Sequence, residues 1–84
     1  MILRNYNPYI SKKEFRRIIR ILILEGQQPC MEQQNTELNI WYNHPTLPQR
    51  NCHRLGMFRT KHFCGQFMEE LEEIMETVRT ELGL

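Results

Sequence analysis

Apolar residues recur at helical spacing in two parts of the chain. In the first, residues 12–25, they form a stripe about 100° wide. Its members are Phe15, Ile18, Ile19 and Leu22. Ser11 and Glu14 have the spacing of a capping box, in which the serine hydroxyl accepts from the amide at the third helical position and the glutamate reaches back to the serine amide. The pattern predicts a helix that Gly26 ends, although its isoleucine-rich end would also suit a strand.

The second amphipathic part is the C-terminal segment, residues 67–82. Its apolar face consists of Phe67, Met68, Leu71, Ile74, Met75, Val78 and Leu82. The opposite face is rich in glutamate and carries Glu69, Glu70, Glu72, Glu73 and Glu76. Because the helix dipole favours negative charge near the N-terminus, these glutamates support a helix that begins near Phe67 and ends at Gly83.

Strand patterns lie between the two helices. In residues 36–43 the apolar Leu38, Ile40 and Tyr42 alternate with Asn39, Trp41 and Asn43, as in a strand with one buried face. Two prolines exclude regular structure over residues 44–51, and residues 52–63 are interpreted as a second strand interrupted near Gly56. Residues 26–36, which have no apolar period, are predicted to be a loop, and residues 1–10 a short strand or arm that ends at Asn7–Pro8.

This order of elements predicts an α+β fold with a single domain, residues 1–84. We expect a two-layer sandwich, in which two amphipathic helices cover one face of a small antiparallel sheet formed near residues 36–43 and 53–63, and the N-terminal segment could add a strand. The longest apolar run, Ile21–Leu24, is far too short to span a bilayer, and no signal segment is recognisable. With an odd number of cysteines, the protein is predicted to be cytoplasmic, with free thiols.

The charge distribution points to a function. No acidic residue occurs between Leu38 and Met68, whereas basic residues are interleaved there with Trp41, Tyr42, Phe58 and Phe63. Because cations contact phosphates and aromatic rings stack on bases, we predict a non-enzymatic regulatory module that binds single-stranded or duplex nucleic acid. The predicted interface is Trp41, Arg50, Arg54, Arg59 and Lys61. The alternative is that the rings belong to the core and the cations are solvated edge residues, which a net charge of only +1 favours.

A rival hypothesis is a protein-binding adaptor or inhibitor. Ile21, Ile23 and Leu24 lie outside the apolar stripe, so they are expected to be buried or to contact another chain, in a homodimer or on a larger partner. The first helix also carries five cations, Lys12, Lys13, Arg16, Arg17 and Arg20. They could lie along phosphates, or pair with the glutamates of an antiparallel final helix.

Metal and enzyme chemistry are not predicted. Cys52, His53, His62 and Cys64 are zinc-ligand types, but their spacing fits no zinc ribbon or finger. Cys64 precedes the predicted final helix, whose N-terminus could lower the pKa of the thiol, but nothing in the sequence orients His62 toward it. The chain has no aspartate, which excludes triads and metal cages that need that residue. We therefore expect no catalysis and no cofactor.

Overall fold

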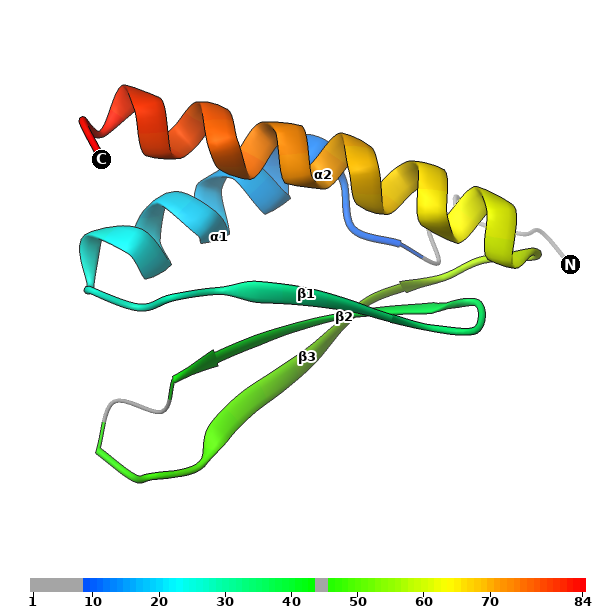
Figure 1. The fold of residues 1–84 in the computed structure, drawn as a ribbon, viewed down its shortest axis with the longest axis horizontal. Coiled ribbons are helices and arrows are strands. Elements are labelled where there is room, and N and C mark those ends of the chain that lie inside the picture. Colours follow the sequence, from blue (N-terminus) through cyan, green and yellow to red (C-terminus); the bar gives the residue numbers. More distant parts are fainter. Residues whose placement is uncertain (1–8, 44–45) are drawn as a thin grey trace, which may run out of the picture.

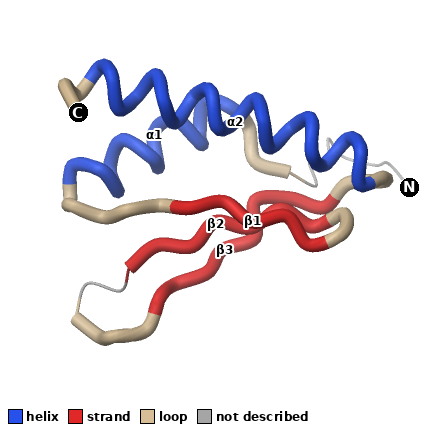
Figure 2. The backbone as a smooth tube through the Cα atoms, viewed as in Figure 1, coloured by secondary structure: helices blue, strands red, loops and turns tan. Residues whose placement is uncertain are grey.

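The computed structural model describes residues 9–43 and 46–84, so residues 1–8 of the predicted N-terminal arm, with its end at Asn7–Pro8, lie outside this range. The last two residues of that segment reach the sheet: Tyr9 forms an antiparallel bridge to Gly56, and the Ile10 amide donates to the Leu55 carbonyl at 2.7 Å. The elements are α1 (Lys12–Leu24), β1 (Cys30–Gln34), β2 (Glu37–Asn43), β3 (Arg50–Met57) and α2 (Lys61–Glu81). The strands form an antiparallel sheet in the order β1-β2-β3, and both helices lie on the same face of it (Figures 1 and 2). The predicted α+β sandwich is confirmed.

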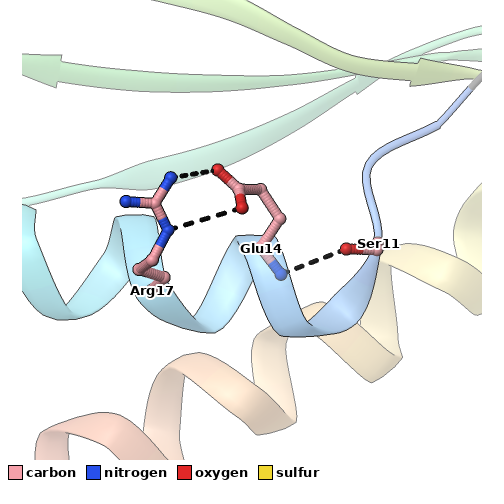
Figure 3. Close-up of polar contacts among 3 residues, drawn as sticks. All are labelled: Ser11, Glu14 and Arg17. Atoms are coloured by element: carbon pink, nitrogen blue, oxygen red, sulfur yellow. Dashed lines mark hydrogen bonds and ion pairs between the residues drawn. The ribbon is translucent and has the colours of Figure 1, made fainter.

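The start of α1 follows the sequence signal in part. Ser11 is the N-cap, and its hydroxyl accepts a hydrogen bond from the Glu14 amide at 3.1 Å (Figure 3). The Glu14 carboxylate, however, accepts hydrogen bonds from the Arg17 guanidinium on the next turn. These hydrogen bonds lower the pKa of Glu14. The helix therefore begins where predicted, with the serine half of the capping box.

Replacing Ser11 with alanine should lower the free energy of unfolding by about 1 kcal/mol, because the Glu14 amide loses its acceptor. Chemical denaturation followed by circular dichroism measures the change. Ser11→Asp is the matched control, since aspartate also accepts at an N-cap and should keep most of the stability. Equal losses in both variants would contradict the capping role.

The loop predicted for residues 26–36 is wrong in its second half, where residues 30–34 form the edge strand β1. The segment has only one buried apolar side chain, Met31, so it has no apolar period to reveal a strand. Its register comes from pairing, with Met31 opposite Ile40 and Gln34 opposite Glu37. Asn35 takes a positive φ of 55° in the two-residue turn between the strands, a conformation that asparagine tolerates.

The strand predicted for residues 52–63 has different limits. β3 already begins at Arg50 and ends at Met57. The pairing register between β2 and β3 shifts where Leu38 pairs with Gly56 and Asn39 with Arg54, which is close to the predicted interruption at Gly56. The last part of the predicted strand is the first turn of α2, which begins six residues earlier than predicted. Thr60 caps this helix, because its hydroxyl accepts from the Phe63 amide at 3.1 Å. The first turn contains no acidic residue, so the expected placement of the glutamates near the helix start is also wrong.

The two helices run in the same direction, not antiparallel (Figure 1). Lys12, at the start of α1, pairs with Glu70, and Arg16 Nη1 lies 3.6 Å from Glu81 Oε1. Positions advance together along both helices, as a parallel arrangement requires. The predicted pairing of basic and acidic helix faces is therefore present, but such exposed pairs contribute only about 0–1 kcal/mol each.

The core lies between the helices and the sheet. Its fully buried side chains come from both layers: Phe15, Ile19, Leu38, Ile40, Cys64, Leu71 and Val78. Three of the four residues in the stripe predicted for α1 are buried, and the fourth, Ile18, packs against the core. The apolar face predicted for α2 supplies further buried or half-buried residues, so the core confirms both helix faces.

Candidate nucleic-acid interface

The sheet has one face against the helices and one open face. Met31, Leu38 and Ile40 are buried against the helices, so the alternating positions of β1 and β2 point to the other side. Cross-strand partners share a face, which places a row of Cys30, Trp41 and Cys52 there, followed by a row of Glu32, Asn39 and Arg54. Neither helix covers this open face (Figure 1).

Trp41 is the aromatic ring of the open face. It is half-buried, and its indole N–H donates a hydrogen bond to Glu32 Oε1 at 2.9 Å. This bond fixes the ring on the sheet and leaves part of its surface accessible. The same contact places a carboxylate beside the ring, which weakens the positive potential at this point.

Arg50 and Arg54 stand on β3, the edge strand farthest from β1. Both are exposed, and their partners Asn43 and Asn39 place them on the open face with Trp41. Arg54 Nη1 lies 3.3 Å from Met57 Sδ, so its guanidinium extends along the strand toward α2. The structure therefore brings three of the five predicted residues to one face.

Arg59 and Lys61 lie at the other end of β3, where the chain enters α2. Both are exposed, and the Lys61 carbonyl accepts a hydrogen bond from the Gln33 side chain at 3.0 Å. Together with Arg50 and Arg54, Arg59 forms a basic edge, which follows β3 and ends where the chain enters α2. Lys61 lies apart from this edge, because it lines a pocket with Gln33 of β1 and with Glu69 and Glu72 of α2. Within residues 9–43 and 46–84, the basic members of ion pairs are Lys12, Arg16, Arg17 and Arg79, so the basic edge has no acidic partner there.

The other predicted aromatic residues do not join Trp41. Tyr42 points to the helix side of the sheet, where its ring stacks on His53 at 5.6 Å. Phe58 stacks on Tyr9 at 5.1 Å, and both rings contact Phe67 of α2. The stacking platform predicted for this region is therefore reduced to one ring on the open face.

A groove that was not predicted lies beside Arg59. Its volume is about 670 Å³, and the rings of Tyr9, Phe58, Phe63 and Phe67 line it, with Lys12 and Arg59 among its polar residues. Phe63 is 56% exposed. Local sequence gives no signal for this groove, because Tyr9 reaches it through a bridge to Gly56, 47 positions along the chain.

The predicted protein-binding residues separate in the structure. Ile23 is buried in the core, so it is not available to a partner. Ile21 and Leu24 remain exposed, at 45% and 63%. The three residues therefore do not form one surface, and two of them make an apolar patch at the end of α1.

Cys52, His53, His62 and Cys64 do not assemble into a metal site. Among the described residues no group of three or more His, Cys or Glu side chains is placed to hold a metal ion. Cys52 is exposed on the open face, whereas Cys64 is buried in the core. Burial raises the pKa of the Cys64 thiol, so the lowered pKa considered for this residue is wrong. Cys64 is the fourth residue of α2, and its burial in the core is the cause of the raised pKa.

The comparisons with known proteins found no match among protein-family models, curated proteins or solved structures. Neither helix of the described chain is long and apolar enough to cross a membrane. The arrangement of the side chains is therefore the sole support for a function.

Proposed function

We propose that this protein is a small, non-enzymatic regulatory module that binds nucleic acid along the basic edge formed by Arg50, Arg54 and Arg59, with Lys61 as a further contact at the start of α2. One observation carries the proposal: these four exposed cations have no acidic ion-pair partner in the described chain. Most glutamates lie instead on α2, at positions 69–81. Cations left without a partner are available to phosphates.

The spacing of the cations suits a nucleic-acid backbone. Arg50 and Arg54 are four residues apart on one strand, so their Cα atoms are separated by roughly 13 Å at about 3.3 Å per residue. Long side chains at that spacing contact different phosphates along a strand. Trp41 lies on the same face and offers a ring for stacking between these contacts.

The low net charge of +1 indicates that binding depends on this local edge and not on a general positive field. If four phosphates are neutralised on a single strand, the affinity should fall with a slope of about −2.8 in log–log terms, or about 50-fold between 50 and 200 mM salt. Binding of a labelled single-stranded oligonucleotide, measured by fluorescence anisotropy across this range, gives the slope.

Two variants locate the contact on the protein. Arg54→Ala and Arg59→Ala should each weaken binding at low salt and reduce the slope by about 0.7. Arg17→Ala is the matched control, because Arg17 lies on α1 and its guanidinium is held by Glu14. Absence of binding at low salt, or an equal loss in the Arg17 variant, would overturn the proposal.

A protein-binding role is the second candidate, and the exposed side chains of Ile21 and Leu24 favour it. Two large apolar residues on one helix end suit a second copy of the chain or a larger partner, as an adaptor or inhibitor requires. Light scattering on the purified protein tests self-association: a dimeric mass that Leu24→Glu converts to a monomeric mass would support it.

The three free thiols fit a cytoplasmic, reducing location for either role.

A further inference from the structure

The groove beside Arg59 joins two kinds of chemistry. Four aromatic rings line it, and two of them, Tyr9 and Phe63, are well exposed. Tyr9 packs within 5.1 Å of Phe58 and 5.0 Å of Phe67, measured between ring centres, so three of the rings form one packed cluster. Phe63 stands on the first turn of α2, where Thr60 holds its backbone amide. The lining is thus an ordered aromatic surface and not a set of isolated rings.

The charged residues of the groove restrict the kind of ligand that it can bind. Its carboxylate, Glu70, is bound by Lys12, which leaves the Arg59 guanidinium as the cation without a partner in the described chain. A ligand that fits must therefore combine a flat apolar ring with an anionic group. A volume of about 670 Å³ is in the range of small-molecule sites and accommodates one base with its sugar.

We propose that this groove takes an unpaired base, stacked on Phe63 and Tyr9, from a nucleic-acid strand whose phosphate contacts Arg59. The inference rests on the proposed function, because Arg59 belongs both to the basic edge and to the groove. It goes further in naming the target: a base inside a duplex is already stacked and cannot enter the groove, so the ligand is a single strand or a strand with an unpaired base.

The test compares one sequence as a labelled single strand and as a blunt duplex, each with the wild-type protein and with Phe63→Ala. Loss of a stacking ring should weaken single-strand binding between about 5-fold and 150-fold. The salt slope should stay unchanged, because no cation is lost. Wild-type protein should also bind the single strand more tightly than the duplex. Phe63→Trp should retain binding, since it restores a ring.

Ile21→Ala is the control, because Ile21 is an exposed apolar residue of α1 that does not line the groove. Wild-type affinity in Phe63→Ala, together with a loss in Arg54→Ala, would overturn the groove inference and leave the basic edge in place. Equal affinity for duplex and single strand would overturn it as well. No binding by the wild-type protein at low salt would remove the proposed function, and with it the groove as a base site.

Discussion

Replacing Phe15 with alanine should lower the free energy of unfolding by about 3–5 kcal/mol. The Phe15 side chain is fully buried on α1, within the core shared by both helices and the sheet. Its removal loses the transfer free energy of the ring and leaves a cavity that the surrounding residues fill only partly. A domain of this size has an unfolding free energy of about 5–15 kcal/mol, so the loss removes a large part of its stability. Urea denaturation followed by circular dichroism measures it.

Phe63→Ala is the matched control, because it makes the same chemical change at a ring that is 56% exposed. Its effect on the unfolding free energy should stay within about 0.5 kcal/mol. A similar loss in both variants would show that burial does not distinguish the two rings, and would contradict the place of Phe15 in the core. The control also establishes that Phe63→Ala is folded when its nucleic-acid binding is measured.

The elements that could be predicted are those whose own residues specify them. α1 has a cap at Ser11 and an apolar stripe of which Phe15 is the first member, and β2 has a strict alternation around Leu38 and Ile40. Each signal is local, since a helix or strand that buries one face repeats its apolar residues at the period of that structure. The C-terminal two-thirds of α2 follows the same rule.

The elements that could not be predicted depend on partners distant in sequence. β1 has one buried apolar residue, and its backbone is ordered by pairing with β2, to which the turn at Asn35 connects it. The first turn of α2 contains exposed Phe63 and buried Cys64, a pattern that also suits a strand. The segment is helical because the Thr60 hydroxyl caps the first turn. The sequence signal for this cap is weak, since no glutamate follows at the third helical position to complete a capping box.

In the candidate site, too, some features follow from local sequence and others depend on residues distant in sequence. Exposure of Arg50, Arg54, Arg59 and Lys61 follows from their charge, which burial would penalise. The grouping of the rings does not follow from composition. Tyr42 and Trp41 are neighbours in sequence and therefore face opposite sides of the sheet, and Phe58 is drawn to Tyr9 and Phe67 by tertiary packing.

In native protein, Cys64 should react with a thiol reagent at least about 1,000-fold more slowly than Cys30 or Cys52. Cys64 is fully buried, whereas the other two thiols are exposed. Its sulfur becomes accessible only when α2 leaves the core, so its rate is scaled by the small fraction of opened molecules. Stopped-flow labelling should give two fast thiols and one slow thiol, and urea should make all three fast. Three fast thiols in native buffer would contradict the packing of α2.

The raised pKa of Cys64 also links stability to pH. Burial disfavours the thiolate, so the unfolded chain releases this proton at a lower pH than the folded protein does. The stabilising effect is therefore complete below the pKa of the unfolded thiol, about 8.5, and is lost as the pH rises toward the folded value. In a Cys30→Ser, Cys52→Ser background, the unfolding free energy should fall over this range by up to about 1.4 kcal/mol per pH unit. Adding Cys64→Ala should remove that part of the slope, because alanine does not titrate. An unchanged slope would assign the pH dependence to the tyrosines and lysines, and not to the buried thiol.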